Sequence, residues 1–183
     1  MTRADALAII DEYVGNPNLK KHMVAVEAAM RTYAAIYHGN PDEWGITGLL
    51  HDFDWEIHPT AESHPSEGQP ILKSRGVPPH IRHAIMAHAF HTGVVPSTNM
   101  ERCLFASDEL TGLIIAVALV MPDKKLSGVT VERVMKKMGQ KAFASNVNRE
   151  EIRKGANLLN VPLEQHIGNV LTAMSAIHTE LGL

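Results

Sequence analysis

The chain has 183 residues, of which 45% are apolar and 20% charged, and its formal net charge is -3. This composition is typical of a globular protein and excludes a disordered or fibrous chain. The 17 Lys and Arg residues form no long basic block, so we expect neither a nucleic acid nor a membrane surface as a partner. The length predicts one domain that covers residues 1–183.

Cysteine usage and the N-terminal segment bear on the compartment. Cys103 is the only cysteine, so no disulfide can form within the chain. The N-terminal segment carries Asp5, Asp11 and Glu12 and lacks the apolar stretch of a signal peptide. The longest uncharged run, residues 110–121, is too short to span a bilayer. We therefore expect a cytoplasmic location.

Gly, Pro and Asn divide the chain into segments of helical length, whereas the alternation typical of strands is missing. A further helix that would begin at His64-Pro65 is ended or kinked by Pro70. We expect an all-α fold of about seven to eight helices, with a site-bearing core at residues 18–121 and residues 122–183 packed on it. The helices are expected at residues 4–14, 18–39, 42–51, 78–93, 99–121, 130–139, 148–160 and from 162 onward, with Asn18, Asn99 and Asn148 as caps.

Several ionisable residues fall where helical periodicity places apolar ones. His22, His88 and Asp108 each interrupt an apolar helix face, and His51-Asp52 follows the apolar end of another helix. A buried charge without a partner is strongly destabilising, so such residues pair with one another or bind a cation. Imidazoles and carboxylates together suit a divalent metal. The pattern therefore predicts a metal site.

Each candidate also has a structural explanation. Taken alone, His22 would suit a hydrogen-bonded core histidine, and Asp52 would suit an acid bonded to amides at a helix end. Asp108 would suit a salt bridge to Arg102, and His64 would suit a cap ahead of a proline-initiated helix. These explanations do not account for the whole set.

The ordered set of motifs resembles a known family. GLLHD, which ends at Asp52, with His22 upstream and ASDELTG around Asp108 downstream, resembles the H…HD…D signature of the HD superfamily of metal-dependent phosphohydrolases. HPSEGQPIL, from His64, and AIMAHAFHTG, around His88, are similar to further segments of that family. The resemblance covers residues 22–111. It implies metal ligation by His22, His51, Asp52 and Asp108, with His64 and His88 added in two-metal members and Asp52 bridging.

The resemblance also implies a chemistry. Asp52 and His51 would form the catalytic centre with one or two divalent ions, which we expect to be Mn, Fe, Co, Ni or Zn, with Mg as a further option. Water activated by the metal would attack a phosphate ester or anhydride of a nucleotide or small metabolite. The alternatives are a di-iron oxygenase and a non-catalytic nucleotide-binding regulatory module. Many members continue with Ile-Gly-Lys, whereas this chain has Phe53, Asp54 and Trp55, so a family lysine is missing.

Substrate contacts are predicted from basic residues near the ligand-bearing helices. We expect Lys20, Lys21 and Arg82 to bind phosphate. Asp54 or Glu56 is expected to act as an acid or base.

The remaining histidines leave several roles open. His91 is a candidate ligand, phosphate contact or solvated loop residue, and His58 competes with His64 for one ligand position. The others lie near predicted helix ends or polar faces. We expect surface positions for His38, His80, His83, His166 and His178.

Overall fold

The computed structural model describes all 183 residues and contains ten α-helices, two 3-10 helices and no strand. The all-α prediction is confirmed, but the predicted number of helices was too low. Two of the ten, α4 and α10, have only six and four residues, too few for periodicity to reveal them. The helices are α1 (Arg3–Tyr13), α2 (Pro17–Ile36), α3 (Pro41–Leu50), α4 (Gln69–Ser74), α5 (Pro79–His88), η1 (Phe90–Thr92), α6 (Asn99–Leu119), η2 (Leu126–Gly128), α7 (Val131–Met138), α8 (Arg149–Leu158), α9 (Leu163–Ala176) and α10 (His178–Leu181).

Two of the three predicted caps are displaced. The cap of α2 is Asn16 rather than Asn18, because its side chain accepts from the Asn18 amide and Pro17 suits the first turn. The cap of α6 is Thr98 rather than Asn99, because Thr98 and Glu101 form a reciprocal capping box. The prediction for α8 is confirmed, since the Asn148 side chain accepts from two amides of its first turn.

The segment between α3 and α4 is built of turns. The helix predicted from His64-Pro65 is wrong, since α4 begins only at Gln69. Pro70 lies in the first turn of α4, where a missing N–H leaves no hydrogen bond unmade. Phe53 anchors the segment because its ring is fully buried in the apolar cluster formed with α1, α3 and α5.

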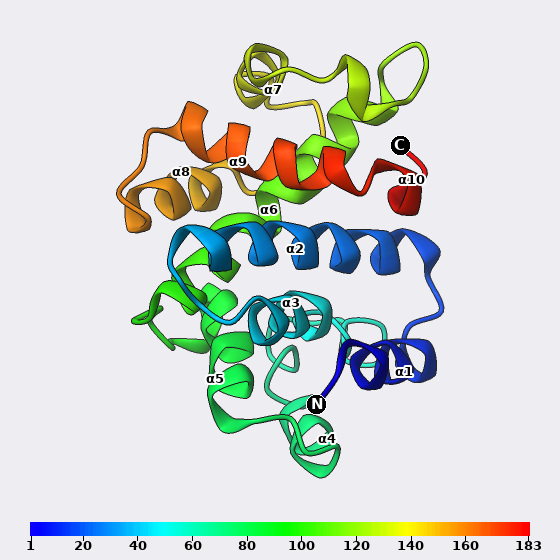
Figure 1. The fold of residues 1–183 in the computed structure, drawn as a ribbon, viewed down its shortest axis with the longest axis vertical. Helices are drawn as coiled ribbons and strands as arrows, with labels where there is room; N and C mark the ends of the chain where they lie inside the picture. Colours follow the sequence, from blue (N-terminus) through cyan, green and yellow to red (C-terminus); the bar gives the residue numbers. More distant parts are fainter.

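Helix α2 lies in the middle of the molecule (Figure 1). In that view α8 and α9 lie on one side of α2, and α1, α3 and α5 lie on the other. Its residues enter both apolar clusters: Val26 and Met30 pack with α6, α8 and α9, whereas Met23 packs with α1, α3 and α5. A residue on the face of α2 between these clusters is therefore surrounded by other helices.

Helices α2 and α3 approach closely at Gly48. A Cβ atom at this position would lie 2.9 Å from the amide nitrogen of Glu27 and from the carbonyl oxygen of Val26. The sequence prediction that a glycine of this helix admits a neighbouring backbone is confirmed. The contact sets the distance between His22 on α2 and His51 at the end of α3. None of the helices combines the length and apolar character needed to cross a bilayer.

Candidate metal centre

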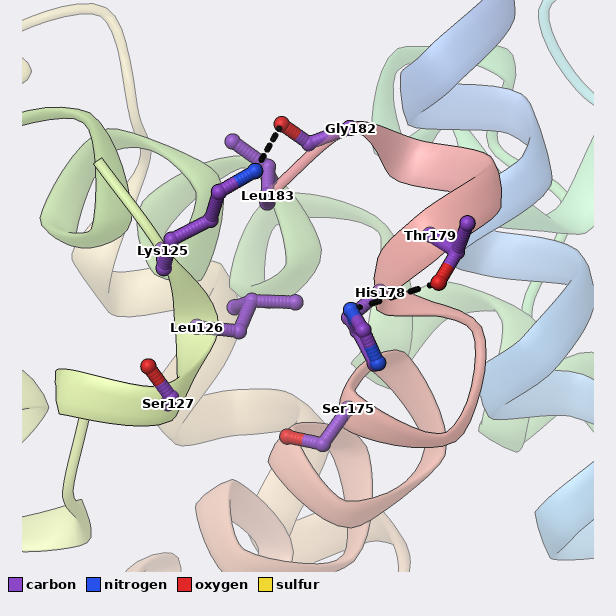
Figure 2. Close-up of a pocket in the computed structure, with 8 residues that line it drawn as sticks. All are labelled: Lys125, Leu126, Ser127, Ser175, His178, Thr179, Gly182 and Leu183. Atoms are coloured by element: carbon purple, nitrogen blue, oxygen red, sulfur yellow. Dashed lines mark hydrogen bonds between the residues drawn. The ribbon is translucent and has the colours of Figure 1, made fainter. Parts of the chain in front are cut away.

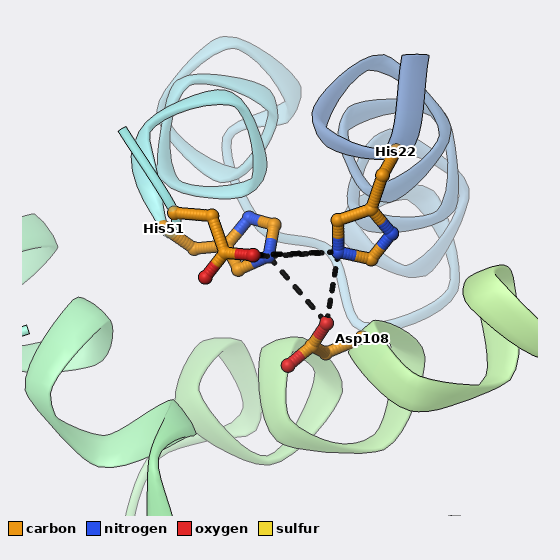
Figure 3. A group of neighbouring side chains, drawn as sticks. His22, His51 and Asp108 are labelled. Atoms are coloured by element: carbon orange, nitrogen blue, oxygen red, sulfur yellow. Dashed lines mark hydrogen bonds and ion pairs between the residues drawn. The ribbon is translucent and has the colours of Figure 1, made fainter. Parts of the chain in front are cut away.

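Four predicted ligands meet at the junction of α2, α3 and α6. Figure 3 shows His22, His51 and Asp108 pointing toward one another from these three helices. The Nε2 atom of His22 lies 3.0 Å from Asp108 Oδ1 and 3.2 Å from His51 Nε2. Asp52 Oδ2 completes the group at 3.4 Å from His51 Nε2. The four donor atoms all lie within 4.8 Å of one another.

Asp52 also belongs to a second group with His64 and His88. Its other oxygen, Oδ1, lies 3.3 Å from His64 Nε2 and 3.6 Å from His88 Nε2. The two Nε2 atoms are 3.3 Å apart. The structure thus brings together all six residues predicted as ligands, and the two oxygens of one carboxylate face different pairs of imidazoles.

Each imidazole is fixed through its Nδ1 atom. His51 and His88 donate from Nδ1 to the carbonyls of Gly48 and Ile85, at 2.7 and 2.5 Å. Since a carbonyl oxygen only accepts, the proton must be on Nδ1 in both rings. Their Nε2 lone pairs therefore face the cluster.

The other two imidazoles, those of His22 and His64, also carry their proton on Nδ1. The Thr111 hydroxyl donates to the Asp108 carbonyl and so accepts from His22 Nδ1, at 3.2 Å. His64 donates from Nδ1 to Asp54 Oδ1 at 2.8 Å. All four Nε2 atoms converge on Asp52 and Asp108, an arrangement that is unfavourable unless protons or a metal ion lie between the facing nitrogen and oxygen atoms. Buried and partly buried imidazoles and carboxylates arranged in this way could hold a metal ion.

The pKa values of the cluster also indicate a site that stabilises positive charge. Burial lowers the pKa of His51, but the charges of Asp52 and Asp108 outweigh burial and raise this pKa well above its usual value. Burial opposes charge on His64 too, yet Asp52 and Asp54 raise its pKa to about 9. The site therefore stabilises positive charge, which protons supply when no cation is bound.

A pocket of about 390 Å³ opens beside both groups, a volume that accommodates a small molecule. Four donor residues of the cluster contribute to its lining, together with the aromatic rings of Trp55 and Phe90 and the carboxyl groups of Glu109 and Glu151. Burial, followed by the charge of Asp108, raises the pKa of Glu109 to about 7. The pocket is lined by Asp52, Trp55, His64, His88, Ala89, Phe90, His91, Asp108, Glu109 and Glu151.

The predicted phosphate-binding residues do not line this pocket. Lys20 pairs with Asp11 at 2.6 Å, and Arg82 donates to the Val77 carbonyl. Lys21 points toward Gly182, near the chain end. The structure therefore does not bring these three side chains to the pocket, because adjacency along a helix does not place a side chain on the ligand-bearing face.

The predicted acid or base residues are also displaced from the pocket. Asp54 is fully buried behind His64, and the carboxylate of Glu56 accepts from the amides of Gly15 and Asn16. His64 rather than His58 joins the cluster. His91 lines the pocket, and its Nε2 donates to the His64 carbonyl at 2.7 Å.

Sequence reasoning missed the residues contributed from beyond the predicted core. Lys154 on α8 does not line the pocket itself, but its Nζ lies 3.6 Å from the centroid of the Phe90 ring, which does, and we call this position the rim of the pocket. Glu151, one turn earlier on α8, lines the pocket itself. No motif in the sequence links α8 to the ligands, so only the packing of α8 on α6 reveals this contribution.

Among the histidines expected at the surface, His166 is a correction. Its side chain is fully buried between α2 and α6, where Tyr33 donates to Nδ1 at 2.5 Å and Nε2 donates to the Ala106 carbonyl at 2.8 Å. Periodicity alone did not reveal this polar contact inside the core. Asp108 pairs with His22 and His51 and not with Arg102, the partner considered from sequence.

A separate hollow of about 460 Å³ lies between η2 and the C-terminal helix (Figure 2). Lys125 donates across it to the Gly182 carbonyl, and Ser127, Ser175 and His178 line it. It contains no group of metal-binding side chains. Of these two hollows, only the pocket beside the His/Asp cluster adjoins side chains that could hold a metal ion.

Comparison of the chain with protein-family models, with curated proteins and with solved structures gave no match. The features of the chain that bear on its function are the geometry of the site and the motifs from His22 to Thr111.

Proposed function

We propose that this chain is a metal-dependent phosphohydrolase that binds two divalent ions. The observation that carries the proposal is the position of Asp52, whose Oδ2 faces His51 and His22 while Oδ1 faces His64 and His88. A carboxylate with its two oxygens in different donor groups is suited to bridge two ions about 3.5–4 Å apart, the spacing found in many two-metal hydrolases. The resemblance to the HD superfamily leads to the same reaction class.

The residues of the chain supply binding, orientation and exclusion of water. Divalent ions held there would lower the pKa of a coordinated water and offset charge on phosphoryl oxygens. Asp52 and Asp108 balance the charge of the ions, and the hydrogen bonds to Nδ1 keep the four imidazoles in the ligating tautomer. Trp55 and Phe90 cover part of the pocket with apolar surface.

The lining of the pocket favours a substrate with one phosphoryl group. It contains no Lys or Arg, its rim carries Lys154, and Glu109 adds negative charge to the lining at a pH above its pKa of about 7, beside the carboxyl group of Glu151. A di- or triphosphate would place several further charges next to these carboxylates. We therefore expect a phosphate monoester, such as a nucleoside monophosphate or a phosphorylated metabolite, whose body packs on the aromatic rings.

The donor atoms limit the range of suitable metal ions but do not select a single one. Four imidazoles and two carboxylates suit Mn, Fe, Co, Ni or Zn better than Mg, which prefers oxygen ligands. The same nitrogen-rich set suits a pair of irons, which makes a di-iron oxygenase the second candidate. The two reactions differ in their need for dioxygen.

The test is metal analysis of protein purified without added ions, followed by phosphate-release assays with Mn, Fe, Co, Ni and Zn. Substrates would include nucleoside mono-, di- and triphosphates and simple monoesters, each assayed with and without air. Release of phosphate from monoesters under both atmospheres is the expected result. Turnover that requires iron and air would favour the oxygenase. Stable metal and nucleotide binding without turnover of any substrate would indicate the regulatory module.

A further inference from the structure

One of the four metal-site imidazoles is fixed differently from the other three. His22, His51 and His88 donate from Nδ1 to uncharged oxygens, a hydroxyl and two carbonyls. His64 donates instead to the carboxylate of Asp54, at 2.8 Å. Asp54 is fully buried and does not line the pocket. A buried carboxylate is costly unless it has a specific partner.

Packing fixes the position of this carboxylate. Asp54 Oδ2 has no hydrogen-bond partner, and a Cβ atom on Gly68 would lie only 2.4 Å from it. Any residue larger than glycine at this position would therefore displace the carboxylate. On another side of His64, the Trp55 ring meets the imidazole edge-on, with 4.9 Å between the ring centroids. His64 is thus held by Asp54 and Trp55, and Asp54 in turn is confined by Gly68.

We propose that Asp54 is a positioning residue that keeps His64 in the Nδ1-protonated tautomer and directs its Nε2 to the ion on the Oδ1 side of Asp52. The inference rests on the two-ion capacity proposed above, but not on the identity of the reaction. The other tautomer would place the Nδ1 lone pair against a buried carboxylate, which is electrostatically unfavourable. Loss of such an outer partner typically lowers metal affinity by about 10- to 100-fold.

The inference is specific to one ion. The first group, with His22, His51 and Asp108, has no contact with Asp54, and its outer partner is Thr111. Substitutions of Asp54 should therefore weaken one ion and spare the other. Substitution of Thr111 should have the reverse effect, which provides a matched control within the same chain.

The experiment measures the stoichiometry and affinity of Mn and Co binding to the full chain, by calorimetry and by the Co absorption spectrum. The variants are Asp54→Ala, Asp54→Asn, Gly68→Ala and Thr111→Val. Asp54→Asn conserves volume and can still accept from Nδ1, so it is expected to bind the second ion with intermediate affinity. Gly68→Ala keeps the carboxylate but moves it. In the metal-free protein at a pH above the His64 pKa of about 9, where the ring is neutral, the ¹⁵N shifts of the His64 ring, assigned with His64→Ala, report the tautomer directly.

We expect two ions in the parent and in Thr111→Val, where the first is the weakened one. Asp54→Ala should lower the affinity of the second ion by about 10- to 100-fold and remove the tautomer preference of His64. Unchanged second-ion affinity and an unchanged His64 tautomer in both Asp54→Ala and Gly68→Ala would overturn the inference. One ion in the parent would also overturn it, while leaving one-metal hydrolysis open. Two ions without phosphate release would instead count against the proposed function alone.

Discussion

Asp108 Oδ1 lies 3.0 Å from His22 Nε2, although these residues belong to the middle of α6 and the first part of α2. The donor set therefore exists only when α2, α3 and α6 are packed together. In the unfolded chain the donors are dispersed, so a bound ion would stabilise the folded state. Ligand substitutions should consequently affect metal content and stability together.

The bridging position of Asp52 gives a prediction about stoichiometry. Asp52→Ala should remove most metal at both positions and also destabilise the fold, because the imidazoles lose their shared counter-charge. His88→Ala should leave one ion bound, because His88 Nε2 faces the Oδ1 atom of Asp52 and not Oδ2. Metal content at saturating Mn, measured by elemental analysis after desalting, distinguishes these outcomes. Full metal occupancy in Asp52→Ala would contradict the assignment of Asp52 as a bridging ligand. Two ions in His88→Ala would show that His88 is not a ligand.

Lys154 at the rim of the pocket gives a prediction about substrate binding. Lys154→Ala should raise KM for a phosphate monoester by about two- to fivefold with little change in kcat, because an exposed charge contributes modestly and uniformly to binding. Lys137→Ala is the matched control, since Lys137 also lies over a phenylalanine, Phe143, at 4.4 Å, but Phe143, unlike Phe90, does not line the pocket. Equal effects of the two substitutions would mean that Lys154 does not contact substrate.

The close approach of α2 and α3 gives a prediction about stability. Gly48→Ala should destabilise the protein by about 1–3 kcal/mol, because its Cβ would meet the backbone of Glu27 at 2.9 Å. Gly112→Ala on α6, where a Cβ would meet nothing within 4 Å, should stabilise it by about 0.4–1 kcal/mol. Urea unfolding of both variants measures the two values. Similar free energies of unfolding for the two variants would show that α2 and α3 can move apart at Gly48 without loss of stability.

His166 gives a prediction about pH. Burial lowers its pKa to about 4, below its ordinary value of 6.5, so the unfolded chain binds the proton more readily. Its contribution to stability is complete above pH 6.5 and is lost as the pH falls toward 4, by about 3 kcal/mol in all.

The control for this effect is His166→Gln, which can still accept from Tyr33 and donate to Ala106 but does not titrate. Unfolding is measured at pH 7 and pH 4 in the presence of a chelator, so that metal binding does not contribute. The free energy of unfolding should decrease less between these pH values in the variant than in the parent. An identical decrease in both proteins would exclude His166 as the titrating group.

The sequence by itself determined the helical class and the ligand candidates. Periodicity shows which residues of a helix share a face, so His22, His88 and Asp108 could be recognised as polar residues on apolar faces. The order of these residues with the His51-Asp52 pair carried the family resemblance. Both inferences depend on spacing within single helices, which is a local property of the chain.

Only the tertiary structure decided what each of these faces meets. Lys21 and Arg82 lie on the ligand-bearing helices α2 and α5 yet do not line the pocket, whereas Lys154 reaches its rim from α8. The burial of His166 and the contact between Asp54 and His64 likewise depend on segments that are distant or irregular in sequence. Helical periodicity fixes the direction of a side chain relative to its own axis, but the packing of helices fixes its neighbours, and those neighbours determine its charge, its tautomer and its role.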